Sequence, residues 1–68
     1  MVPLTARQTE VLGKIVKFKE AKGYAPTFSE LCDELGIGMQ AVNDHLQALQ
    51  KKGRVDWVPR KARTLRVL

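Results

Sequence analysis

The sequence predicts a mainly helical domain that ends in a small β-hairpin. Three segments carry apolar residues at the three- and four-residue spacing of an amphipathic helix, and each follows a residue suited to an N-cap. After residue 53 the pattern changes to alternating apolar and polar side chains, which is typical of strands with one buried face. The 68 residues suffice for one domain with a small core, so we expect residues 1–68 to form one unit.

The first helix is expected over residues 6–22. Thr5 and Gln8 have the form of a capping box, in which the Thr5 hydroxyl accepts from the Gln8 amide and the Gln8 side chain reaches back. Gly23 suits the left-handed position that ends a helix, and Pro26 disfavours helix at the residue before it. The apolar stripe of this helix is formed by Val11, Leu12, Ile15 and Phe18.

A second capping box at residues 27–30 (TFSE) begins a shorter helix that Gly36 is expected to end. Ile37 is expected to fill the core from the turn that follows. The apolar side of this short helix is formed by Leu31, Leu35 and Cys32.

The third helix is expected from about Met39 to Lys52, between Gly38 and Gly53. Glycine is a weaker N-cap than threonine, so the start of this helix is the least strongly specified of the three. Its apolar face is formed by Val42, Leu46 and Leu49. The opposite face is polar and is formed by Gln40, Asn43, Asp44 and Gln47. Between the two faces lie Ala41, His45 and Ala48.

Two short strands are expected after the third helix, joined by the basic loop 59–63. An isolated hairpin is not stable in water, so its apolar face must pack on the helices. The residues expected on that buried face are Val55, Trp57, Leu65 and Val67.

The net charge of +5 is concentrated at the end of the chain. Residues 51–68 carry seven Lys and Arg residues against Asp56 alone, whereas residues 1–50 carry five against six acidic residues. Such a concentration suggests an acidic polymer as the partner, although a solvated tail that aids solubility is the alternative interpretation.

Two helices joined by a tight glycine-bearing turn and followed by a basic hairpin predict a winged helix-turn-helix. In this architecture the third helix fits the major groove of duplex DNA, where each base pair shows a distinct pattern of donors and acceptors. Side-chain amides can pair with adenine, and a carboxylate can accept from cytosine. The candidate base contacts are Met39, Gln40, Ala41, Asn43, Asp44 and Gln47. Taken alone, the polar residues of this set also fit an ordinary solvated helix face.

Affinity for DNA is expected to come mainly from phosphate contacts. The expected contacts are three cations of the loop between the strands, two at the end of the third helix, and the threonines that begin the first two helices. They are Arg60, Lys61, Arg63, Lys51, Lys52, Thr5 and Thr27.

An enzyme is not expected. The chain has one His and one Cys, no nucleophile paired with a base and no phosphate-binding glycine loop after a strand. The histidine has no second ligand at metal-binding spacing, so no metal, cofactor or small-molecule ligand is predicted. No apolar run approaches the roughly 20 residues that cross a bilayer. The lone Cys32 can form no internal disulfide, which fits a reducing compartment, so we expect a cytoplasmic protein.

Five groups of residues spread over nearly the whole chain have a recognisable arrangement. They are Leu4-Thr5-Ala6-Arg7-Gln8, Gly23 with Pro26-Thr27 and Glu30, Leu35-Gly36, His45-Leu46 with Ala48-Leu49, and Lys52-Gly53. Together they resemble the N-terminal DNA-binding domain of LexA-type SOS-response repressors. The resemblance implies a winged helix that represses transcription by binding operator DNA, usually as a dimer on a palindrome. It also implies that residues 39–44 contact bases and that the wing contacts the backbone.

Two features depart from that family pattern. The turn between Gly36 and His45 is one residue shorter and lacks a serine- or asparagine-rich start, so the family's operator sequence is not carried over. LexA-type repressors also use a C-terminal domain for dimerisation and serine–lysine self-cleavage, and self-cleavage is not expected of this chain. A fragment of a longer repressor and a small regulator from a phage or mobile element both fit.

Two other functions compete with sequence-specific DNA binding. A winged helix that binds a partner protein predicts that changes at Gln40 and Asn43 leave DNA binding untouched. Binding of nucleic acid by charge alone predicts that changes at Arg60 and Lys61 weaken binding to every sequence equally.

Overall fold

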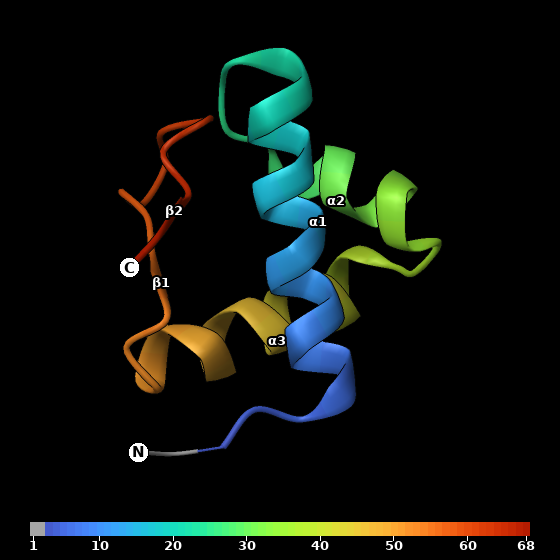
Figure 1. Cartoon of the computed structure of the whole chain (residues 1–68), viewed down its shortest axis with the longest axis vertical. Helices are drawn as coiled ribbons and strands as arrows, with labels where there is room; N and C mark the ends of the chain where they lie inside the picture. The colour runs from blue at the N-terminus through green and yellow to red at the C-terminus, as the bar shows by residue number, and fades with distance from the viewer. Residues whose placement is uncertain (1–2) are drawn as a thin grey trace.

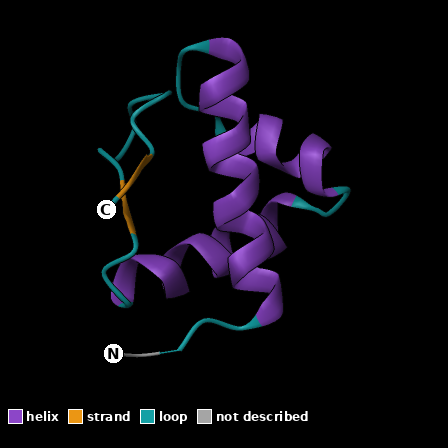
Figure 2. Ribbon diagram, viewed as in Figure 1, coloured by secondary structure: helices purple, strands orange, loops and turns teal. Residues whose placement is uncertain are grey.

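A computed structural model describes residues 3–68 as three helices packed around one core, with a short two-stranded hairpin at their side (Figures 1 and 2). The elements are α1 (Ala6–Lys22), α2 (Phe28–Leu35), α3 (Met39–Lys51), β1 (Val55–Asp56) and β2 (Arg66–Val67). In Figure 1, α1 stands upright, α3 crosses near its lower end, and the hairpin and α2 lie on opposite sides of it. The predicted class, mainly helical with an antiparallel hairpin, is confirmed.

Both predicted capping boxes are present. The Thr5 hydroxyl accepts from the Gln8 amide at 3.1 Å, and the Gln8 side-chain oxygen accepts from the Thr5 amide at 3.1 Å. At α2 the Thr27 hydroxyl accepts from the Glu30 amide at 3.1 Å, and the Glu30 carboxylate accepts from the Thr27 amide at 2.8 Å. These reciprocal bonds satisfy amides that a helix start leaves without partners, so they fix where each helix begins.

The helix ends follow the glycines closely. Gly36 has a φ of 68°, in the left-handed region that glycine enters without steric cost, and its amide donates to the Cys32 carbonyl. Gly38 precedes α3 without any side-chain cap, as its lack of a side chain requires. α3 ends one residue earlier than expected, at Lys51, and Lys52 occupies the C-cap position.

The core lies where the three helices and the hairpin meet. All three apolar helix faces predicted from the sequence contribute to it, and the hairpin adds one residue from each side. Its buried members are Val11, Ile15, Ala25, Leu31, Val42, Leu46, Leu49, Val55 and Leu65. Ile37 is half-buried and packs on this core from the turn between α2 and α3, as predicted.

The hairpin is shorter and less covered than predicted. Its strands pair only Val55 with Val67 and Asp56 with Arg66. Val67 was expected to be buried, but 43% of its surface is exposed, so that prediction is wrong. The reason is that Val67 lies over the edge of the helical layer: it lines an open groove with Val16 of α1, which is itself 40% exposed. Trp57 is half-buried and meets Phe28 edge to face at 5.4 Å.

Candidate nucleic-acid interface

The buried residues of α3 are the predicted ones, Val42, Leu46 and Leu49. Because they anchor one side of α3 against α1 and α2, the opposite side faces solvent over the length of the helix. The turn that joins α2 to α3 spans only residues 36–38, so the two helices are held in a fixed relation. This arrangement presents one exposed helix face to a partner.

Two side-chain pairs organise the polar face of α3. The Gln40 Nε2 atom donates to the Asp44 Oδ1 atom at 3.1 Å, and the Gln47 Nε2 atom donates to the Asn43 Oδ1 atom at 3.4 Å. Each pair links residues four apart, which are neighbours on a helix surface. The other atom of each amide, the Gln40 oxygen and the Asn43 nitrogen, has no hydrogen-bond partner within residues 3–68. The face therefore offers both an acceptor and a donor.

The structure brings the remaining predicted base contacts to the start of the same helix. Met39 is the first residue of α3 and is 49% exposed, whereas Ala41 is half-buried at the boundary of the polar face. Gln40, Asp44 and Gln47 are exposed, and Asn43 is half-buried. All six predicted base contacts thus lie along α3, with Met39 and Ala41 able to offer apolar surface.

The loop between the strands, residues 57–65, forms the wing. The Thr64 hydroxyl closes this loop by accepting from the Val58 amide at 2.9 Å and lying 3.0 Å from the Lys61 carbonyl. Arg60 and Lys61 at its tip are exposed, and neither takes part in an ion pair within residues 3–68. Arg60 has a φ of 66°, an unusual backbone conformation for a residue other than glycine.

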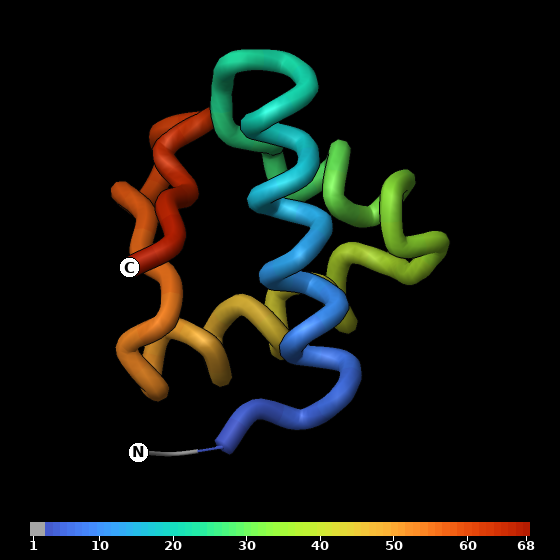
Figure 3. The backbone as a smooth tube through the Cα atoms, in the orientation of Figure 1, coloured from blue at the N-terminus to red at the C-terminus, as the bar shows by residue number. Residues whose placement is uncertain are grey.

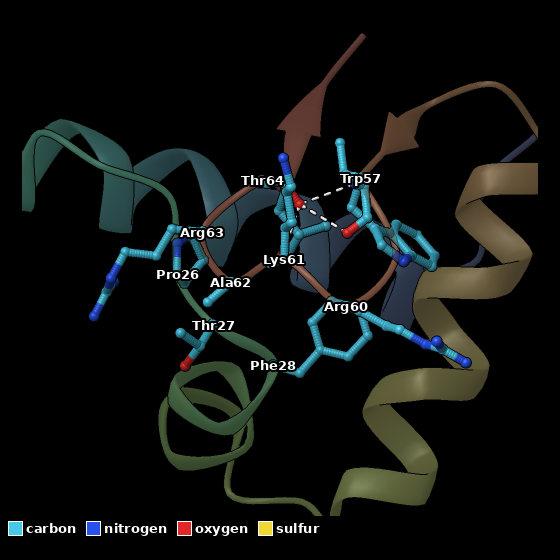
Figure 4. A pocket seen from close by; sticks show the side chains of 11 residues that line it. Pro26, Thr27, Phe28, Trp57, Arg60, Lys61, Ala62, Arg63 and Thr64 are labelled. Carbon is cyan, nitrogen blue, oxygen red and sulfur yellow. Dashed lines mark hydrogen bonds between the residues drawn. The ribbon is translucent and has the colours of Figure 1, made fainter.

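A groove of about 290 Å³ separates the wing from the beginning of α2. Phe28 and Trp57 contribute aromatic rings to its lining, and Thr27 lies at its α2 side (Figure 4). In the same view Arg60 and Arg63 extend in opposite directions from the wing. The two arginines, which the sequence placed together as phosphate contacts, are therefore separated in space.

Arg63 is exposed, yet its side chain is engaged by other groups of the protein. Its guanidinium binds both carboxylate oxygens of Glu30, at 2.9 and 3.3 Å, and donates to the Ala25 carbonyl at 3.1 Å. The same group lies 4.4 Å from the centre of the Tyr24 ring. Arg60 and Lys61 at the wing tip form no ion pair within residues 3–68, so Arg63 is the cation of this loop that is already paired.

Glu30 has a larger structural role than the sequence predicted. It was expected to cap α2, and it also joins α2 to the wing. Hydrogen bonding to the Thr27 backbone and then to Arg63 lowers the pKa of Glu30 below its ordinary value of 4.5. Glu30 and Arg63 are 33 residues apart and share no local motif, so only their opposite charges hinted at the pair.

The two lysines at the end of α3 also differ. Lys51 is exposed, whereas the Lys52 ammonium donates to the Pro3 carbonyl at 3.0 Å and to the Gln8 side-chain oxygen. Gln8 is the one buried polar residue of the described chain. Lys52 thus ties the end of α3 to the beginning of α1.

The threonines predicted to contact phosphates lie at the N-caps of α1 and α2. Their hydroxyl oxygens accept the capping bonds, which leaves each hydroxyl hydrogen free to donate. Thr5 is exposed and Thr27 is half-buried beside the wing groove. A helix start favours anions, because its free amides and dipole both present positive charge.

The single cysteine and the single histidine of the chain lie partly within the protein. Cys32 and His45 are both half-buried, and Cys32 packs against the core. Within residues 3–68, no helix combines the length and the apolar character needed to span a bilayer.

Residues 1–64 match the family model described as the LexA DNA binding domain. A LexA repressor of Haemophilus influenzae (strain PittGG) is 42% identical over 69 residues, which cover all of this chain and 33% of that protein. LexA repressor 1 of Pseudomonas syringae pv. tomato is 40% identical over 98% of this chain and 34% of its own length. The chain thus spans about a third of the length of the curated relatives it matches. With its helix-turn-helix, its wing and a family match over nearly every residue, the chain belongs to the LexA DNA-binding domain family.

Proposed function

We propose that residues 1–68 form one domain that binds duplex DNA in a sequence-specific manner and represses transcription. The observation that carries the proposal is the pairing of an exposed polar helix face on α3 with free cations on the neighbouring wing. The names of the relatives, which are LexA repressors, support repression rather than activation. Binding to an operator is sufficient for this function, and it requires no chemistry from the protein.

In the proposed complex α3 enters the major groove. Gln40 and Asn43 are the strongest candidates for base readout, because their amides can pair with adenine. Gln40 has a free side-chain oxygen that can accept, and Asn43 has a free side-chain nitrogen that can donate. Asp44 and Gln47 hold these two side chains in place and can also reach base edges. Met39 and Ala41 offer apolar contact to a thymine methyl group.

The wing and the helix ends supply the phosphate contacts. Arg60, Lys61 and Lys51 are exposed and unpaired within residues 3–68, so each can neutralise a phosphate without first breaking an ion pair. The N-cap threonines of α1 and α2 can donate to further phosphates. Lys52 and Arg63 complete the predicted set, but both are held by other groups of the protein.

A dimer on a palindromic operator, in the bacterial cytoplasm and at the nucleoid, completes the proposal. One module of this size offers a small interface, so two copies on two half-sites would raise both affinity and specificity. The half-sites are then expected to be spaced by whole turns of the double helix.

Selection of bound duplexes from a random DNA library at two salt concentrations tests the proposal. An enriched motif that persists at both salt concentrations supports sequence-specific regulation, and a palindromic motif supports a dimer. Asn43→Ala should then lose about 1–3 kcal/mol of discrimination at one position of the motif. Steeply salt-dependent binding without any motif would contradict the proposal and favour binding by charge alone.

The control variant for this experiment is Gln50→Ala. Gln50 is exposed on α3, outside the predicted base contacts, and its side chain donates to Asp56 at 3.3 Å. The motif selected by this variant should match that of the unmodified protein. If Gln40→Ala and Asn43→Ala also leave the motif and the affinity unchanged, α3 is not the reading element, and a protein partner becomes the better explanation of its polar face.

A further inference from the structure

The wing has little internal structure of its own. The two strands that flank it form only two residue pairs, and within the loop Thr64 supplies most of the hydrogen bonds. A hairpin this short is not stable alone, so contacts with the helices must set the direction in which the wing points. One such contact is the Phe28–Trp57 pair, and another is made by Arg63.

The contact between Arg63 and Glu30 has the two-point geometry of an oriented ion pair. The guanidinium fork engages both oxygens of one carboxylate, and the same group is shared with a backbone carbonyl and the face of Tyr24. Planar two-point pairing of this kind fixes orientation as well as position. The Arg63 backbone, with a φ of 60°, turns the side chain toward α2 and away from the direction that Arg60 takes (Figure 4).

The other end of the attachment is equally well held. Glu30 is the third residue of α2, and its Oε1 atom accepts both from Arg63 and from the Thr27 amide. The carboxylate is therefore fixed to the beginning of α2 by the capping box. The tube in Figure 3 shows the wing loop returning beside the connector between α1 and α2, which carries the Ala25 carbonyl that Arg63 also binds.

We propose that Arg63 is a positioning residue that holds the wing against α2 through Glu30, and that it is not a phosphate contact. The inference rests on the proposed DNA-binding function and revises one member of its phosphate set. The wing is then oriented before DNA arrives, and Arg60 and Lys61 reach the backbone without an additional ordering cost. Such preorganisation raises affinity without adding a contact.

The decisive variant is Glu30→Gln. A glutamine at this position still accepts from the Thr27 amide, so the capping box and α2 are retained. The change removes a negative charge, and simple electrostatics predicts tighter binding to DNA. The positioning role predicts the opposite: binding to the selected duplex should weaken about two- to tenfold, the range expected when a side chain must be ordered on binding.

Arg63→Lys separates the two roles at the arginine itself. Lysine keeps the charge but lacks the planar fork, so a phosphate contact would be largely preserved. The positioning role instead predicts that Arg63→Lys loses most of the affinity that Arg63→Ala loses. It also predicts that combining Arg63→Ala with Glu30→Gln weakens binding no further than Arg63→Ala alone, because Glu30→Gln weakens only the attachment that Arg63→Ala already removes.

The salt dependence of binding provides a matched comparison with Lys61→Ala. Loss of a phosphate contact lowers the slope of log K against log salt by about 0.9, so Lys61→Ala should show that reduction. Arg63→Ala should weaken binding while leaving the slope near that of the unmodified protein. A slope reduced as much as in Lys61→Ala, or tighter binding by Glu30→Gln, would overturn the proposal.

A measurement without DNA keeps this test independent of the proposed function. Backbone ¹⁵N order parameters of residues 58–64 should fall in Glu30→Gln and in Arg63→Lys, but not in Lys61→Ala. Unchanged order parameters would overturn the positioning role even if the protein bound no DNA. Failure of the unmodified protein to select any DNA motif would instead contradict the proposed function and leave the order-parameter result to decide the attachment.

Discussion

The helix-turn-helix and the wing are built on different principles. Both capping boxes and the left-handed glycine ends act within five residues of chain, and the apolar faces of the helices then pack on one another. The wing depends on partners far away in sequence: Arg63 binds a residue 33 positions earlier and a carbonyl 38 positions earlier. Local signals therefore determine the helix proposed to read bases, whereas tertiary contacts orient the wing, which is proposed to contact the DNA backbone.

The two regions also differ in charge. The exposed face of α3 carries no Lys or Arg before Lys51, and its polar side chains are paired with one another. The wing tip carries exposed cations instead. The proposed function therefore assigns specificity to α3 and affinity to the wing, and variants should be able to change one without the other.

The largest expected difference between the regions is in stability. Leu46 is fully buried on α3, so Leu46→Ala should lower the free energy of unfolding by about 2–5 kcal/mol. A domain of this size is only marginally stable, and such a loss should unfold much of the population at 37 °C. Urea denaturation followed by circular dichroism measures the change.

Val67→Ala is the matched change in the hairpin. Because Val67 is 43% exposed, its truncation should alter the free energy of unfolding by no more than about 0.5 kcal/mol. Equal destabilisation by the two changes would contradict the idea that the helices carry the stability and the hairpin is an attachment.

A smaller effect is expected where α3 meets α1. Lys52→Met removes the ammonium that binds the Pro3 carbonyl and the buried Gln8 side chain, and it should cost about 1–2 kcal/mol of unfolding free energy. Lys51→Met, at an exposed neighbour, should cost less than about 0.5 kcal/mol but reduce the salt slope of DNA binding by about 0.9. The opposite pattern in the two variants would identify Lys52 as the phosphate contact.

The helices could be predicted closely because their determinants are local. Two complete capping boxes and three terminal glycines stand in the sequence at their required spacings, and only the end of α3 moved, by one residue. The exposed polar face of α3 followed from the same periodicity, since burial of Val42, Leu46 and Leu49 leaves the opposite side exposed. The placement of the predicted base contacts on α3 therefore needed no tertiary information, although their contact with DNA stays a prediction.

The presence of a basic hairpin could be predicted from the sequence, but the burial and pairing of its side chains could not. Alternation in the sequence does not reveal how far the helical layer extends, so Val67 was assigned to the core although the layer ends beneath it. Charge alone does not reveal which cations are already paired, so Arg60 and Arg63 appeared equivalent. Both differences arise from contacts between segments that are distant along the chain.

Acidic pH should weaken the contacts of two carboxylates, Glu30, which caps α2 and binds the wing, and Asp56 on β1. The pKa of Glu30 lies below its ordinary 4.5, and that of Asp56, which accepts from Gln50 and then from the Trp57 backbone, lies below 3.8. Depressed values mean that the unfolded chain binds more protons than the folded protein between the folded and the ordinary pKa. The resulting stability is complete above about pH 4.5 and is lost as the pH falls through the folded values.

Thermal unfolding measured between pH 6 and pH 3, across the ordinary 4.5 of Glu30, checks this dependence. The midpoint should fall as the pH passes below 4.5, and the fall should be shallower in Glu30→Gln, which has no proton to bind. The effect should be modest because both carboxylates are exposed to solvent, where ion pairs contribute little. An identical profile in Glu30→Gln would assign the acid sensitivity to other carboxylates.

A small effect is expected at the wing tip, where the changes in stability and in DNA binding should separate. Arg60 has a φ of 66°, and any residue with a Cβ atom is strained there by about 1 kcal/mol, whereas glycine is not. Arg60→Gly should therefore be more stable than Arg60→Ala by roughly 0.5–1 kcal/mol. Both variants remove the same cation, so both should lower the salt slope of DNA binding by about 0.9. If the glycine variant also bound DNA more weakly than the alanine variant, the strained backbone itself would contribute to the shape of the wing, and the wing would be preorganised by its own loop as well as by Arg63.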